Sequence, residues 1–293
     1  MSNLLAIIIP YYKITFFRET LECLAVQTDQ RFHVYIGNDA SPEDPSALLE
    51  NFRGKFDFTY KRFEENMGSK SLTNHWDRCI AMMKDEEWFM ILGDDDCLSQ
   101  NAIEDFYKNI GVAEKENISV IKLNSTIVDE NNSMMSEKKT EPFIKSAVEH
   151  FFDKFISEGR SSLSEHIFGK SMYKRYGFKD LPFAWHADDL AVLEFSEYGN
   201  IMFLETAVCY VRVSSQSISG NPQSNKTEKW LATKMFFDAV CENLPHFSTE
   251  QRRKLFDLIE WHEKDKNMQV KIPNRLSEFL NVYGYRGVIK FLR

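Results

Sequence analysis

The sequence predicts an α/β protein, with a mostly parallel sheet flanked by helices and a helical C-terminal extension. Apolar runs of strand length alternate with helical patterns and short connections through the first third of the chain. Three of these runs end in polar or acidic residues, at Tyr11, Asp39 and Asp94. Because right-handed crossovers bring parallel strand ends to one edge of a sheet, we expect these residues to converge.

The first elements follow one another as strand and helix. The apolar run 4–9 is stopped by Pro10 and is typical of a buried parallel strand. Further strands are predicted at 32–36, 56–63 and 88–92. Helices are predicted at 15–27, 44–52, 71–83 and 101–109.

The pattern changes beyond residue 117. Strands are predicted at 119–124, 201–203 and 207–213, with an irregular to extended stretch at 161–168. Helices are predicted at 146–157 and from Leu190 onward, and the chain is helical in character from Glu228 to its end. The polar stretch 214–226 is predicted to be a long loop, and loops of this length are often lids or disordered.

The composition excludes several classes of protein. A net charge of −8 argues against a general nucleic-acid binder, because phosphate backbones attract basic surfaces. The five cysteines form no C-x-x-C pair, so we expect reduced thiols and neither a disulfide framework nor a zinc site. The N-terminus lacks the basic start of a secretory signal, and no apolar stretch is long enough to span a membrane. We therefore expect a cytoplasmic protein with no nucleic-acid partner.

The densest negative charge follows the apolar run 88–92, where Gly93 precedes Asp94, Asp95 and Asp96. Adjacent carboxylates repel one another, and oxygen ligands suit a hard divalent cation such as Mg²⁺ or Mn²⁺. The stretch therefore predicts a metal site at a strand end. The alternative is a solvated acidic turn in which Asp96 caps the next helix.

Four stretches resemble the motifs of family 2 glycosyltransferases, which have the GT-A fold. Residues 8–12 (IIPYY) are similar to the family's strand-Pro-x-Tyr-Asn, and residues 38–44 (NDASPED) are similar to DDGSxD. Residues 65–68 (ENMG) are similar to N-x-G before a helix, and residues 92–104 (LGDDDCLSQNAIE) to LDxDDxLxPxALE. The resemblance implies a Rossmann-like GT-A domain, nucleotide-sugar-binding and catalytic, at residues 1–222 and a helical extension at 223–293.

The resemblance also implies a site for a nucleotide-sugar donor, with a UDP-sugar expected. Asp39 would recognise the base, Asp95 would be the main metal ligand, and Asp94 would contact the ribose or the metal. The cofactor would be Mn²⁺ or Mg²⁺, which neutralises charge on the leaving diphosphate. The other expected donor contacts are Pro10, Tyr11, Tyr12, Asn66, Gly68, Lys70 and Arg212.

Inverting transfer needs a general base for the acceptor hydroxyl. The resemblance places this base at the start of a helix, in the pair Asp188-Asp189. Alignment through Gly199 favours Asp188 and alignment through the acidic pair favours Asp189; both are kept, with Asp189 preferred. The alternative is that the pair only complements the helix dipole. The expected acceptor contacts are Asp96, Trp185 and His186, of which the last two are equally compatible with ordinary packing.

The implied acceptor is a glycan or a lipid-linked saccharide in bacterial-type surface polysaccharide synthesis. The basic and apolar segment 271–293 would then favour peripheral contact with the inner face of the membrane, its alternative being a helix packed onto the domain. Three positions depart from the family's motifs: Gly93 replaces an acid, Thr73 an arginine and Ser214 a histidine. These departures support a second hypothesis, a catalytically degenerate protein that binds a nucleotide-sugar or a glycan.

Overall fold

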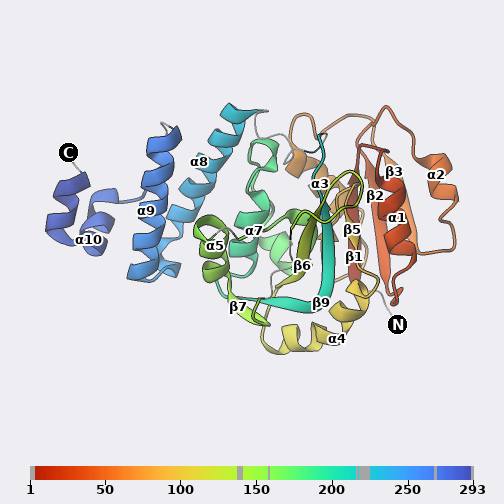
Figure 1. The fold of residues 1–293 in the computed structure, drawn as a ribbon, viewed down its shortest axis with the longest axis horizontal. Helices are drawn as coiled ribbons and strands as arrows, with labels where there is room; N and C mark the ends of the chain where they lie inside the picture. Colours follow the sequence, from red (N-terminus) through yellow and green to blue (C-terminus); the bar gives the residue numbers. More distant parts are fainter. Residues whose placement is uncertain are drawn as a thin grey trace.

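A computed structural model of the chain describes residues 4–136, 141–157, 159–215, 217, 225–266 and 269–291 (Figure 1). In these residues a nine-stranded sheet has the order β3-β2-β1-β4-β8-β6-β9-β5, and β7 pairs with β9. The strands are β1 (Leu5–Tyr11), β2 (Phe32–Asn38), β3 (Phe58–Arg62), β4 (Trp88–Ile91), β5 (Cys97–Leu98), β6 (Val120–Val128), β7 (Ile144–Ser146), β8 (His166–Gly169) and β9 (Asn200–Arg212).

The described chain has helices packed on both faces of this sheet and further helices beyond it (Figure 1). They are α1 (Phe17–Ala25), α2 (Ser46–Glu50), α3 (Leu72–Ile80), α4 (Ala102–Lys115), α5 (Ala147–Ile156), α6 (Lys170–Tyr176), α7 (Ala187–Phe195), α8 (Lys226–Glu242), α9 (Thr249–Lys266) and α10 (Arg275–Phe291). Short 3-10 turns occur at Leu163–Glu165, Pro182–Ala184 and Leu244–His246.

The first four strands form the predicted parallel layer. β1 pairs in parallel with β2 and with β4, and β2 pairs in parallel with β3. β1 is buried on both faces: Ala6 and Ile8 belong to one apolar cluster, and Leu5, Ile7 and Ile9 belong to the other. This two-sided burial explains why the strand is a continuous apolar run and not an alternating one.

The second half of the sheet departs from the prediction at β8 and β9, and its short strands β5 and β7 were not predicted. The extended stretch near residue 165 forms β8, which lies antiparallel between β4 and β6. β9 is one strand, and the prediction of two strands is wrong. The register of β9 with β6 shifts between Leu123 and Asn124. At this shift the side-chain Nδ2 of Asn124 donates to the carbonyls of Leu204 and Glu205, which provides these carbonyls with hydrogen-bond partners.

The C-terminal helices pack side by side, at the end of the molecule farthest from β3 and α2 (Figure 1). Phe236 of α8 lies in the same apolar cluster as Phe151 of α5. Phe279 of α10 stacks on Phe256 of α9, with ring centroids 4.8 Å apart. The expected boundary between residues 222 and 223 lies outside the described residues, and it stays a prediction.

Candidate functional site

A cavity of about 460 Å³ opens where β4 and β9 end and α7 begins. Its wall includes the three acids after β4 together with Lys13, Asp188 and Asp189. The segment 161–164 and the segment 183–186 line it as well. The predicted convergence of polar strand ends is therefore confirmed for the turns after β1 and β4, and the acids of α7 join them.

Asp94 ties two neighbouring strand ends together. Its Oδ2 accepts hydrogen bonds from the amides of Tyr12 and Lys13, both at 2.7 Å. Burial, followed by the charge of Asp95, raises the pKa of Asp94 to about 7, and the two amides oppose this shift. A cation close to this carboxylate would stabilise its charged form.

Asp96 does not cap α4, whose N-cap is Asn101, so the capping alternative is wrong. The Oδ1 of Asp96 instead accepts a hydrogen bond from the amide of Arg212 at 2.8 Å. Burial, and then the charge of Asp95, raises the pKa of Asp96 to about 7. A Cβ on Gly93 would lie 2.9 Å from Asp96 Oδ2 and 3.0 Å from Asp95 Oδ1. The two carboxylates therefore occupy the space that an acid at position 93 would need.

The acids after β4 fit a hard divalent cation that takes part of its shell from a substrate. Among the described residues, no other residue donates a hydrogen bond to the Asp95 carboxylate, and Arg212 Nε donates to the Asp95 carbonyl, at 3.0 Å. Burial raises the pKa of this carboxyl too. In the described part of the chain, no three His, Cys, Asp or Glu side chains are arranged to share one ion. The set thus suits one or two carboxylates plus phosphate oxygens and water, and not a closed protein cage.

The two acids of α7 have different surroundings. Lys154 pairs with Asp189 Oδ1, and His186 Nδ1 lies 2.8 Å from Asp189 Oδ2. Burial raises the pKa of Asp189, but Lys154 and His186 more than offset it, so the pKa lies well below its usual range. Burial, followed by the charge of Asp189, raises the pKa of Asp188 to about 7. Since no described side chain donates a hydrogen bond to Asp188, this is the acid suited to accept a proton near neutral pH.

The motifs at residues 38–44 and 65–68 are joined through Asp39. Its Oδ1 accepts the amide of Met67 at 2.7 Å and also pairs with Arg78, and its Oδ2 accepts the amide of Gly68 at 2.8 Å. A Cβ on Gly68 would lie 2.6 Å from Asp39 Oδ2, so this approach requires glycine. Asp39 is 3% exposed and does not line the 460 Å³ cavity. Its contact with a base stays a prediction.

Two of the expected donor contacts are used elsewhere in the fold. Tyr11 is fully buried against Phe17, with ring centroids 4.7 Å apart, and its hydroxyl donates to the Glu43 carbonyl at 2.9 Å. The Tyr11 ring belongs to the core beneath the end of β1. It is therefore not placed to contact the base of a nucleotide. Lys70 is exposed and its Nζ lies 3.4 Å from Glu65. It does not line the cavity, because the turn at 67–71 directs it to the surface.

Arg212 is the third expected contact that the fold itself uses. The residue is 2% exposed. Its guanidinium donates to the carbonyls of Asp95 and Asp129, at 3.0 and 2.8 Å, and to Glu19 at 2.6 Å. It holds the turn after β4 against α1 and against the end of β6. Arg212 also lines the 460 Å³ cavity, so its contact with a donor stays a prediction.

The remaining predicted positions lie near strand and helix ends. Tyr12 is 38% exposed beside Asp94, and Pro10 is half-buried on β1. Asn66 holds its own turn by accepting the Ser69 amide at 2.8 Å. Thr73, in place of the family's arginine, donates to Asp180 at 2.8 Å. This position therefore supplies no cation to the cavity.

Two lysines of the cavity were not predicted, Lys13 and Lys154. Lys13 follows the first strand end, which is a signal available in the sequence. Lys154 lies on α5 between Phe151 and Phe155, and a lysine inside an apolar helical stripe is also a recognisable signal. Its partner Asp189 is not recognisable from local pattern.

The segment before α7 is strained. Phe183, Ala184 and His186 have φ angles of 56°, 51° and 68°, a region that L-residues seldom adopt. Such strain concentrates at functional sites. The segment places Trp185 in the cavity wall, with Lys229 Nζ 4.8 Å from its ring centroid. His186 also lines the cavity, but its ring stacks on a phenylalanine of α8 and its Nδ1 is committed to Asp189.

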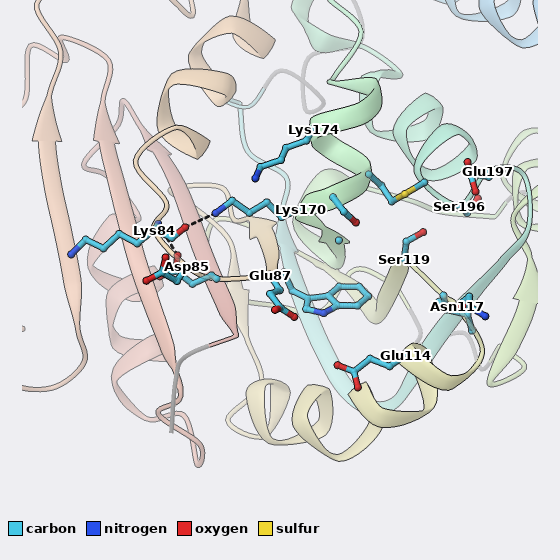
Figure 2. Close-up of a pocket in the computed structure, with 16 residues that line it drawn as sticks. Lys84, Asp85, Glu87, Glu114, Asn117, Ser119, Lys170, Lys174, Ser196 and Glu197 are labelled. Carbon is cyan, nitrogen blue, oxygen red and sulfur yellow. Dashed lines mark hydrogen bonds between the residues drawn. The ribbon is translucent and has the colours of Figure 1, made fainter.

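A second cavity, of about 810 Å³, lies at the opposite edge of the sheet, where β4 begins. Figure 2 shows Lys170 and Lys174 on one side of it and Glu87 and Glu114 on the other. Lys170 Nζ donates to the Lys84 carbonyl at 2.6 Å. No predicted site residue lines this cavity, so we assign the site to the smaller one.

Comparisons with known proteins identify the family and the fold. The model of glycosyl transferase family 2 matches residues 6–181, more than half of the chain. The crystal structure of residues 1–349 of S. aureus TarS with UDP-GlcNAc has a TM-score of 0.69 at 14% identity, over 96% of this chain and 79% of that one. The same TarS segment with UDP has a TM-score of 0.63 at 14% identity, over 100% and 78% of the two chains.

A further S. aureus TarS structure has a TM-score of 0.65 at 15% identity, over 97% of this chain and 48% of that one. Identities this low establish similarity of fold, and they confirm the predicted α/β fold class of GT-A type. A search of curated protein sequences finds no match.

Proposed function

The chain belongs to glycosyl transferase family 2, and on this premise we propose that it transfers a sugar, with inversion, from a UDP-sugar to a hydroxyl of a glycan or lipid-linked saccharide in surface polysaccharide synthesis. Glycosyltransferase activity itself follows from the family. The choice of UDP is supported by the TarS structures, which contain UDP-GlcNAc and UDP.

The observation that carries the proposal is the cavity shared by the acids after β4 and the acids of α7. In the proposed reaction the acceptor hydroxyl gives its proton to a carboxylate of α7. The acceptor oxygen attacks the anomeric carbon from the face opposite the diphosphate. The bond between that carbon and the diphosphate oxygen breaks, and the nucleoside diphosphate leaves.

We assign the base to Asp188, although alignment of the acidic pair favours Asp189. Both oxygens of Asp189 bind Lys154 and His186, and its pKa is held low, so it is a weak base. Asp188 lines the same cavity, and its pKa is raised to about 7. A base works best when its pKa lies near the operating pH, because it is then ionised and still basic enough to take the proton.

On the donor side, we propose that the diphosphate lies beside Asp95 and Lys13. Mn²⁺ or Mg²⁺, held by Asp95 with Asp94 or Asp96, would neutralise charge on the leaving diphosphate. Because Tyr11 is buried, we propose that Tyr12, which is exposed beside Asp94, is the tyrosine that contacts the base.

On the acceptor side, aromatic side chains offer apolar faces to a sugar ring. Trp185, Phe183 and Trp76 all line the cavity, and Phe183 is 37% exposed. Aromatic faces of this kind suit the C–H face of a sugar. We therefore keep Trp185 as an acceptor contact and assign His186 to the support of Asp189.

A lipid-linked acceptor would bring the enzyme to a membrane surface as a peripheral protein. Among the described residues, no helix has the length and apolar character needed to cross a bilayer. α10 packs onto α9 through Phe279, and Tyr283 donates to Asp257 at 2.7 Å, as the packed-helix alternative expects. The side chains of Arg286, Lys290 and Arg293 lie outside the described residues. Flotation with anionic vesicles, with and without residues 271–293, tests this part of the proposal.

The donor proposal is tested by a thermal-shift screen of UDP, GDP and dTDP with and without Mn²⁺. A ligand at about 100 times its Kd stabilises a protein by about 2.7 kcal/mol, which is readily measured. We expect a UDP shift that depends on Mn²⁺, and release of UDP from a UDP-sugar when an acceptor is added. Absence of any nucleotide shift would overturn the donor assignment. A shift without turnover would support the degenerate binding protein instead.

A further inference from the structure

Each carboxylate oxygen of Asp189 has a partner. Lys154 of α5 pairs with Oδ1, and His186 lies 2.8 Å from Oδ2. The Lys154 and Asp189 side chains are 19% and 6% exposed. Lys154 Nζ also donates to the Ser161 carbonyl at 3.1 Å, which fixes the ammonium from a second side. The Lys154–Asp189 pair is therefore built into the floor of the cavity.

The other ionisable groups around this pair are balanced or neutral. Lys122 of β6 lies 3.2 Å from Glu165, and both side chains are buried. Burial lowers the pKa of His150 on α5 and of His166 on β8 to about 3, so both rings are neutral near pH 7.

Across the cavity lie the acids after β4 and Lys13, and Lys229 of α8 lies over Trp185. Among the described acids of α7, Asp188 and Glu194 have no ion pair, and of these two Asp188 is the one that lines the cavity.

We infer that Lys154 is a positioning residue for the transfer reaction: it holds Asp189 as a fixed anion and thereby makes Asp188 the proton acceptor. This inference rests on the proposed function. With Lys154 in place, Asp189 keeps its charge and its geometry, and the acceptor proton passes to Asp188 as the glycosidic bond forms and the bond to the diphosphate breaks.

Without Lys154, the two adjacent carboxylates of α7 would share one cavity with no cation paired to either of them. One of them would then hold a proton at neutral pH, and the pair would titrate together. The base would be ionised only at higher pH, so the loss of activity would depend on pH.

The test uses Lys154→Met, Lys154→Gln and Lys154→Arg in the full chain. We expect the acidic limb of the kcat/KM profile to move to higher pH by about one unit or more in the Met and Gln variants. The Arg variant keeps the charge and should restore the wild-type profile. Gln retains hydrogen-bonding capacity toward Asp189 and provides a second neutral variant if Met fails to fold.

Lys145→Met is the matched control. Lys145 of β7 is also poorly exposed, at 12%, and it pairs outside the cavity with Asp153 of α5, the helix that carries Lys154. A purely structural role for Lys154 would lower kcat/KM by one factor at every pH, in the neutral variants and in Lys154→Arg alike. That result, or an equal pH shift in Lys145→Met, would overturn the inference.

A second readout does not depend on turnover. The carboxyl ¹³C resonances of Asp188 and Asp189 report their titration directly, and in Lys154→Met both should titrate at higher pH than in the wild type. Unchanged titration would refute the inference. If the wild type transfers no sugar while the titration moves as expected, the proposed function fails and the role of Lys154 in the acid pair stands.

Discussion

Replacing Asp188 and Asp189 one at a time by Asn should separate activity from stability. Asp188→Asn removes the proposed base, and a general base contributes about 10²- to 10⁴-fold. We expect kcat to fall by that factor while the fold stays intact, because no described side chain pairs with Asp188. Asp189→Asn instead leaves the Lys154 ammonium without its carboxylate, so the main loss is in folding free energy.

The size of that loss can be worked out from the pair. Removing one member of a buried ion pair costs about 3–5 kcal/mol. Lys154 is 19% exposed and keeps its hydrogen bond to the Ser161 carbonyl, which places the loss near the lower end, about 3 kcal/mol. A large domain loses about 2–4 °C in Tm for each kcal/mol, so Asp189→Asn should melt about 6–12 °C lower.

The Asp188→Asn variant also has a pH signature. The pKa of Asp188 in the folded protein, about 7, lies above the ordinary aspartate value near 3.9. The stability that this group contributes is therefore fully present below about pH 3.9 and is lost as the pH rises through about 7. The Asn variant does not undergo this loss, so its Tm relative to the wild type should rise between about pH 4 and 8.

Calorimetric melting across this pH range, together with UDP release at neutral pH, measures both effects. The reasoning is refuted if Asp188→Asn retains full turnover. It is also refuted if Asp189→Asn melts with the wild type at every pH.

Three further predictions concern the donor and acceptor sides. Gly68→Ala places a Cβ 2.6 Å from Asp39 Oδ2 and should cost about 1–3 kcal/mol in urea unfolding, whereas Gly111→Ala, with nothing within 4 Å, should not. Asp95→Asn should abolish the Mn²⁺-dependent part of the UDP thermal shift; an unchanged Mn²⁺ dependence would exclude it as a ligand. Trp185→Ala should raise the acceptor KM by about tenfold, as for about 1.4 kcal/mol of lost contact, and leave the donor KM unchanged.

Local patterns were sufficient to predict the strands that carry the site. The runs that end near Tyr11 and Asn38 are apolar because those strands are buried on both faces. The same reasoning failed at β9, where Glu205 and Thr206 interrupt the apolar run. The strand continues there because Asn124, from the neighbouring strand, covers the exposed carbonyls. That contact joins residues about 80 positions apart and leaves no mark on the local pattern.

By itself the sequence determined the fold class, the acidic strand end and the presence of an acidic pair at the start of a late helix. These features depend on short-range periodicity and on the order of elements. Only the tertiary structure decided which charged groups remain available for chemistry. Arg212 and Lys154 find carboxylates 193 and 35 positions away. Burial in the folded cavity then separates the pKa of Asp188 from that of Asp189. Neither the pairing nor the loss of water exists in the unfolded chain, so neighbouring aspartates that look equivalent in sequence acquire different roles only on folding.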